Sequence, residues 1–117
     1  YVNDWLNDSS AIKINKFDEI IKVKTMTLDE VIQKINKKIK LIKIEAEGAE
    51  PEVLYGLNDQ INKVQYITID AGPERNNETT IIDCLNYLKE SSFELISFYQ
   101  PRVGLLFENK IFDKELN

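Results

Sequence analysis

Short apolar runs alternate with segments of helical periodicity through most of this chain, and this alternation limits its possible folds more than any other feature. Strand-like runs occur at Leu41–Glu45 and Val64–Asp70. Helices are expected after each of them, at Ala49–Tyr55 and Thr79–Ser91. Strands that alternate with helices form parallel β-α-β units. The sequence therefore predicts an α/β fold built on parallel strands with flanking helices.

Strands of a second kind are expected toward the two ends of the chain. Near the C-terminus, Phe93–Tyr99 and Val103–Glu108 are strand-like runs with a short connection, which predicts an antiparallel hairpin. Near the N-terminus, Ala11–Asn15 and Glu19–Met26 are short and partly alternating, and we expect two further strands there.

A helix is also expected from Thr27 onward. Thr27 and Glu30 have the spacing of a capping box, in which the two side chains bond each other's backbone N–H groups. Apolar residues then recur at helical spacing: Leu28, Val31, Ile32, Ile35 and Ile39. We expect a single partial domain, with N-terminal strands and loop over residues 1–26 and an α/β core over residues 27–117.

The composition argues against several classes of function. A net charge of −5 disfavours nucleic-acid binding, which needs clustered cations. The chain has no histidine, so a metal site would have to use oxygen ligands. The single cysteine, Cys84, is expected to be a small core residue and fits a reducing, cytoplasmic compartment. No apolar run reaches the ~20 residues of a membrane span, so no membrane partner is expected.

Three linked motifs occupy residues 25–57, which read TMTLDEVIQKINKKIKLIKIEAEGAEPEVLYGL. This segment resembles the FkbM family of S-adenosylmethionine-dependent methyltransferases, whose pattern is a T-L-D helix, a strand ending L-K-I-D-x-E-G-A-E, and a helix with V-L-x-G. The matching residues are Thr27, Leu28 and Asp29, then Ile42–Glu45 with Glu47–Glu50, then Val53, Leu54 and Gly56. The family also places an acid after the next strand, and Asp70 is there.

Two positions depart from the family pattern while keeping their charge. Position 45 is usually Asp and is Glu here, and position 70 is usually Glu and is Asp here. The resemblance implies the C-terminal half of a class I, Rossmann-like methyltransferase domain. It implies methyl transfer from S-adenosylmethionine to a hydroxyl of a sugar or small metabolite. It also implies catalytic roles for Glu45, Glu47 and Asp70, cofactor contacts by Glu45 and Gly48, and no metal ligand.

The positions of these acids support a site but leave a structural alternative open. In an open α/β sheet, ligands bind beyond the carboxyl ends of the strands, and Glu45 and Asp70 stand at two such ends. The alternative is that Glu47 and Glu50 complement a helix N-terminus. Gly48 is expected to serve the backbone of the turn.

The sequence lacks the glycine-rich loop that lets a backbone approach a nucleotide, because no two of its four glycines are close together. We therefore expect the N-terminal half of the family domain to lie outside this chain, and the chain alone not to hold the cofactor. Two rival hypotheses are a non-catalytic binding or assembly module and a carboxylate metal site. The apolar strand Leu41–Glu45 would then lack a neighbour. Either the N-terminal strands Ala11–Asn15 or Glu19–Met26 fold over this edge, or a second copy supplies a strand, and we expect the homodimer.

Overall fold

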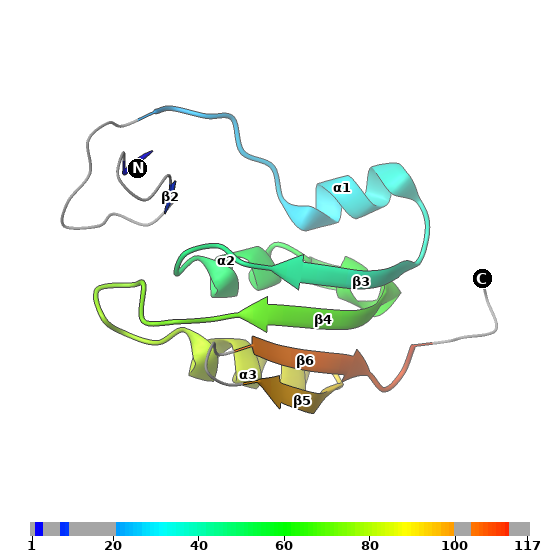
Figure 1. Cartoon of the computed structure of the whole chain (residues 1–117). Helices are drawn as coiled ribbons and strands as arrows, with labels where there is room; N and C mark the ends of the chain where they lie inside the picture. Colours follow the sequence, from blue (N-terminus) through cyan, green and yellow to red (C-terminus); the bar gives the residue numbers. More distant parts are fainter. Residues whose placement is uncertain (1, 4–7, 10–20, 100–103, 113–117) are drawn as a thin grey trace.

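A four-stranded sheet forms the centre of the structure, a computed structural model (Figure 1). The residues described are 2–3, 8–9, 21–99 and 104–112. The strands of the sheet are, in spatial order, β3 (Ile39–Ile44), β4 (Val64–Asp70), β6 (Gly104–Asn109) and β5 (Phe93–Tyr99). β3 and β4 are parallel, whereas β6 runs antiparallel to both of its neighbours. The predicted parallel unit and the predicted hairpin are both confirmed.

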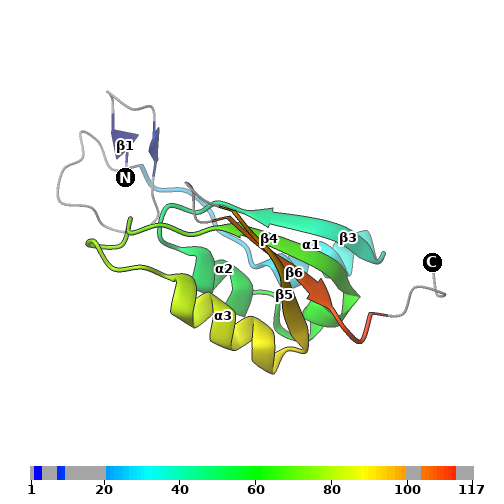
Figure 2. The ribbon, with the colours of Figure 1, turned by 60° about the horizontal axis from the view of Figure 1, so that its bottom comes forward.

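Helices cover one face of this sheet. They are α1 (Leu28–Ile35), α2 (Glu50–Tyr55), the 3₁₀ helix η1 (Asn58–Lys63) and α3 (Ile81–Glu90). Figure 2 shows α2 and α3 on the same face. In Figure 1 α1 lies next to the β3 edge, and it contacts η1. A separate two-stranded pair consists of β1 (Val2–Asn3) and β2 (Asp8–Ser9).

The first helix is shorter than its apolar pattern predicts. It ends at Ile35, because Asn36 adopts a left-handed conformation with φ of 50°, and Ile39 already belongs to β3. The predicted capping box is wrong as well. The Thr27 side chain makes no capping hydrogen bond, and its hydroxyl donates instead to the carboxylate of Asp29.

The N-terminal strands predicted from sequence are not supported where the structure describes them. Residues 21–26 form no strand, and their side chains are exposed. An alternating pattern makes a strand only where a neighbour supplies backbone partners, and none of the described residues does so for this segment. The strand predicted at Ala11–Asn15 lies outside the described residues.

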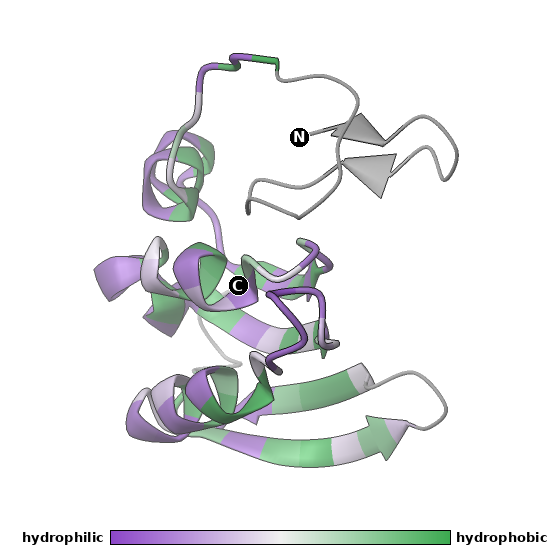
Figure 3. Cartoon of the chain, turned by 90° about the vertical axis from the view of Figure 1, so that its left-hand side faces the viewer, coloured by the Kyte–Doolittle hydropathy of each residue, from purple (hydrophilic) through white to green (hydrophobic). Residues whose placement is uncertain are grey.

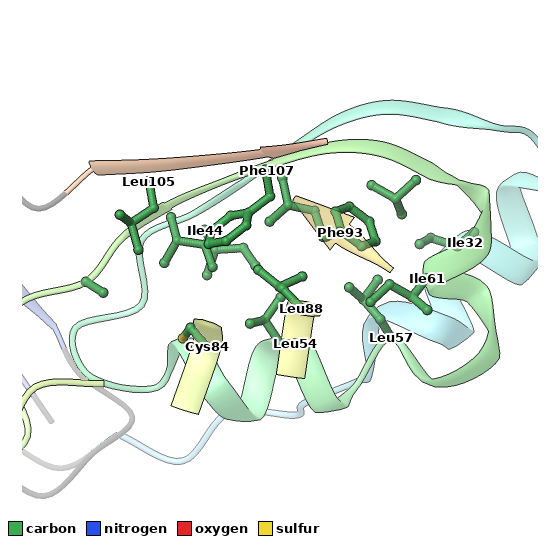
Figure 4. Close-up of a cluster of buried hydrophobic side chains, with 14 residues drawn as sticks. Ile32, Ile44, Leu54, Leu57, Ile61, Cys84, Leu88, Phe93, Leu105 and Phe107 are labelled. Atoms are coloured by element: carbon green, nitrogen blue, oxygen red, sulfur yellow. The ribbon is translucent and has the colours of Figure 1, made fainter. Parts of the chain in front are cut away.

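The core lies between the sheet and the α2–α3 layer. Figure 4 shows Leu105 and Phe107 of β6 directed toward the helices, where they meet Leu54 of α2 and Leu88 of α3. Hydrophobic residues accordingly gather on the strands and on the inner sides of the helices (Figure 3). Cys84 is fully buried, as predicted, and burial raises the pKa of its thiol to about 12. The thiol therefore stays protonated at neutral pH and serves packing.

Candidate functional site

Two acidic residues predicted to form the site lie at the same end of the sheet. β3 and β4 are parallel neighbours, and Ile44 pairs with Ile69 near their carboxyl ends. Asp70 is the last residue of β4, and Glu45 directly follows β3. The fold therefore brings these two carboxylates to adjacent strand ends, where open α/β sheets bind ligands.

Glu45 remains accessible at this position. Its side chain is 39% exposed and pairs with the ammonium group of Lys43, which is 64% exposed. This ion pair gives the ammonium group of Lys43, which lies within an apolar strand, an acidic partner. Asp70 is half-buried. A carboxylate that is both charged and reachable can accept a proton or meet a cationic ligand.

The turn after β3 depends on two residues with left-handed backbone. Glu47 has φ of 48° and Gly48 has φ of 91°. A Cβ atom at Gly48 would lie 3.1 Å from the backbone nitrogen of Arg75, which is tighter than nearly all contacts of this kind. Both the backbone angle and the close approach require glycine at this position. The expected role of Gly48 in backbone geometry is confirmed.

Glu50 is the buried acid of this turn. It is 1% exposed, and its Oε1 accepts hydrogen bonds from the backbone N–H groups of Ala46, at 3.1 Å, and Gly48, at 3.0 Å. Its Oε2 accepts a hydrogen bond from the Thr80 hydroxyl, at 2.8 Å. A buried carboxylate needs such partners to offset its loss of hydration. Glu50 therefore holds the turn after β3 against the start of α3.

Arg75 makes a second connection between the same two loops. It lies between β4 and α3, and its Nε donates to the carbonyl oxygen of Gly48 at 2.8 Å. Its guanidinium also pairs with the carboxylate of Glu52. This hydrogen bond lowers the pKa of Glu52 below its usual value. Glu52 is therefore an exposed residue of α2 that also makes an ion pair.

We call the set formed by Glu50, Thr80 and Arg75 the loop brace. It fixes the β3–α2 turn to the β4–α3 loop, and each strand end carrying a candidate acid lies beside it. Sequence reasoning missed Thr80 and Arg75, because their partners are 30 and 27 residues away along the chain. No local spacing reports such a contact. The only sign in the sequence was that Arg75 lies in a loop close to the acids Glu74 and Glu78.

The Methyltransferase FkbM domain matches the chain over residues 3–97, which is most of its length. The chain belongs to the FkbM methyltransferase family. The match extends beyond residues 25–57, where the three motifs lie, on both sides. Neither a curated protein nor a solved structure gives a significant match.

The other two FkbM motifs contact each other away from this turn. The backbone N–H of Asp29 donates to the carbonyl oxygen of Gly56 at 2.9 Å, and the Asp29 carboxylate accepts a hydrogen bond from the Asn58 amide at 3.0 Å. Hydrogen bonds from the Thr27 hydroxyl and this amide lower the pKa of Asp29. The first motif therefore fastens α1 to the end of α2, which is a structural role.

The described part of this FkbM chain presents no ready metal site. Within it, no group of three or more Asp, Glu or Cys side chains is arranged to hold a metal ion. Its helices are also too short or too polar for any of them to cross a bilayer. The site is therefore best described by its two strand-end acids, its glycine turn and the loop brace.

Proposed function

We propose that this chain forms one wall of a methyl-transfer site that uses S-adenosylmethionine and acts on a hydroxyl of a sugar or small metabolite. Membership of the FkbM family supports the reaction class. The strand order β3-β4-β6-β5, with antiparallel β6 between two strands of the opposite direction, supports the second half of a class I, Rossmann-like methyltransferase sheet. The observation that carries the proposal is the parallel register that sets Glu45 beside Asp70.

The residues at this edge suit part of the cofactor. S-adenosylmethionine carries positive charge at its sulfonium and amine groups, and the accessible carboxylate of Glu45 can face such a cation. The backbone of Gly48 is fixed by the loop brace, so it can present a constant surface to the ligand. The chain has no glycine-rich loop for the nucleoside. We therefore propose that residues 1–117 are a partial domain and that a further segment completes the cofactor site.

The chemistry assigned to this chain is positioning and proton removal. When bound, S-adenosylmethionine supplies an electrophilic methyl carbon. An acceptor hydroxyl that attacks this carbon forms an O–C bond as the C–S bond breaks, and its proton must go to a base. Glu45, Glu47 and Asp70 are the candidate bases, because Glu50 is buried and already accepts three hydrogen bonds. The same proposal places the protein in the cytoplasm, with no nucleic-acid partner.

Calorimetric titration of the 117-residue chain with S-adenosylmethionine tests the partial-domain proposal. We expect no micromolar binding, because the chain supplies only one side of the site. Micromolar binding by the purified chain would mean that it holds the cofactor without a glycine loop.

Amide substitutions test the assigned acids in the protein that contains this chain. Transfer of labelled methyl groups to a panel of sugars and small hydroxyl compounds is measured for Glu45→Gln and Asp70→Asn. Loss of a general base lowers turnover by ~10²–10⁴-fold, and melting should be nearly unchanged. Glu90→Gln, at the exposed end of α3, is the matched control. Full turnover in both amide variants would contradict the catalytic roles proposed for Glu45 and Asp70. A folded protein that methylates no acceptor favours the non-catalytic module instead.

We also propose that the isolated chain pairs with a second copy through β3. Within the described residues β3 pairs only with β4, and no strand pairs with its other edge, beside which α1 lies. An antiparallel register centred on Ile42 sets Leu41 opposite the second copy's Lys43, and no lysine faces another lysine. Sedimentation equilibrium at micromolar concentration should show a dimer. Leu41→Lys places like charges opposite each other and should give a monomer, whereas a monomeric unmodified chain contradicts the pairing.

A further inference from the structure

A cleft of about 360 Å³ opens between α3 and the β5–β6 hairpin. Phe93 and Phe107 form its floor; both are buried, and Figure 4 shows them near Leu88 in the core. Leu85 of α3 and Leu95 of β5 form its sides, and Leu95 is 41% exposed. The surface that the cleft presents is therefore mainly hydrocarbon, and its volume lies within the range of small-molecule sites.

Polar groups stand only at the rim of this cleft. Asn86 and Lys89 lie on α3 and share one face of the helix, because they are three residues apart. Glu94 also lines the rim, but its carboxylate pairs with the ammonium group of Lys110 at 2.7 Å. Lys89 makes no ion pair within the part of the chain that the structure describes. The rim thus carries one uncompensated cation beside an amide donor.

We propose that this cleft binds an apolar carboxylic acid. The hydrocarbon part of the ligand lies on Phe93 and Phe107, and its carboxylate accepts hydrogen bonds from Lys89 and Asn86. A neutral apolar ligand would use the floor and leave the cation unpaired. A cationic ligand would be repelled by Lys89, because Glu94 is already paired.

The position of the cleft separates it from the proposed methyl-transfer site. Phe93, the first residue of β5, pairs with Asn109, whose side-chain amide donates to the carbonyl oxygen of Val64 at the start of β4. The cleft therefore lies at the amino ends of β4 and β5, whereas Glu45 and Asp70 lie at carboxyl ends. Binding here can therefore be measured without methyl transfer.

Titration with octanoate, followed by backbone amide NMR of the 117-residue chain, tests the proposal. Shifts should gather on Leu85, Lys89, Leu95 and Phe107, and 1-octanol should bind more weakly at the same place. Lys89→Gln should weaken octanoate binding by ~2–5-fold, as expected for an exposed ion pair, and leave octanol unchanged. Lys34→Gln, an exposed lysine on α1, is the matched control and should change neither.

A cleft-filling variant gives a second readout. Leu95→Trp places a bulky ring in the cleft from a partly exposed position, so binding of both ligands should be lost while the chain stays folded. Octanoate binding that is equal in unmodified chain and Lys89→Gln overturns the assignment of a carboxylate ligand. Shifts scattered over other exposed apolar residues, or absent altogether, overturn the site.

Discussion

Glu45 and Glu50 belong to the same turn, but their surroundings differ completely. Glu50 is 1% exposed and accepts hydrogen bonds from two backbone N–H groups and a hydroxyl. Glu45 has a side chain that is 39% exposed, and its cation Lys43 is more exposed still. The turn therefore has a buried carboxylate at its base and an accessible carboxylate at its rim.

This difference shows that burial and the number of donors decide what an acid in the motif can do. A carboxylate held by three donors cannot leave them without exposing unsatisfied polar groups, so it stabilises the backbone. An accessible carboxylate loses little when it moves to a ligand. The family motif supplies both kinds, and the structure separates them. The predictions that follow test whether this separation holds.

Glu50→Ala should have the largest effect. The substitution leaves the N–H groups of Ala46 and Gly48 without their acceptor, and each unsatisfied group costs ~1–3 kcal/mol. We expect the free energy of unfolding, measured in urea, to fall by ~3–5 kcal/mol. Thr80→Val removes only one donor, but from a charged acceptor, and should lower the free energy of unfolding by ~1.5–3 kcal/mol. Equal losses in the two variants would contradict a backbone role for Glu50.

Gly48→Ala should come next. The new Cβ atom would lie 3.1 Å from the Arg75 nitrogen, and the backbone would keep φ of 91°. Strain of this kind costs ~1–3 kcal/mol, which thermal or urea unfolding can measure. Gly104→Ala is the control, because among the described residues the nearest atom to its new Cβ is the Cβ atom of Tyr99 at 3.7 Å. A Gly48→Ala chain as stable as the control would show that the loops can separate freely.

Arg75→Gln should have a smaller, pH-dependent effect. Arg75 lowers the pKa of Glu52 from its usual value of 4.5, so the ion pair stabilises the fold above that pH and is lost as pH falls through the lowered pKa. Because Glu52 is 53% exposed, the ion pair contributes only ~0.2–1 kcal/mol to the free energy of unfolding. The stability gap between unmodified chain and Arg75→Gln should narrow below about pH 4.5. The gap should not change with pH in a Glu52→Gln background.

The strands of the sheet were largely predictable from the sequence, whereas the boundaries of the helices were less so. The predicted bounds of β4 and β5 coincide with the observed ones, since a short apolar run between turn residues defines a strand on its own. The first helix was predicted too long because Ile39 fits a helical stripe as well as a strand. The helix ends because Asn36 has a left-handed backbone, and the apolar pattern gives no sign of this conformation.

The candidate site likewise has some features that were predictable from the sequence and others that were not. The strand-end positions of Glu45 and Asp70 and the turn conformation of Gly48 follow from local pattern, so the sequence indicated them. The loop brace does not, because Thr80 and Arg75 meet the turn only after the second β-α unit has folded. One alternative for Glu50 was that it complements a helix N-terminus, whereas its partners lie in the turn and at the start of α3.

The most direct test of this account is urea unfolding of the matched pair Glu45→Gln and Glu50→Gln. Both variants make the same chemical change, one at the rim and one at the base of the turn. At the buried Glu50 position, the amide replaces charge-assisted hydrogen bonds with weaker neutral ones. We therefore expect the free energy of unfolding to fall by ~1.5–3 kcal/mol. At Glu45 only an exposed ion pair is lost, so less than ~1 kcal/mol is expected. Equal losses, or a larger loss at Glu45, would contradict the division between a structural and an available carboxylate.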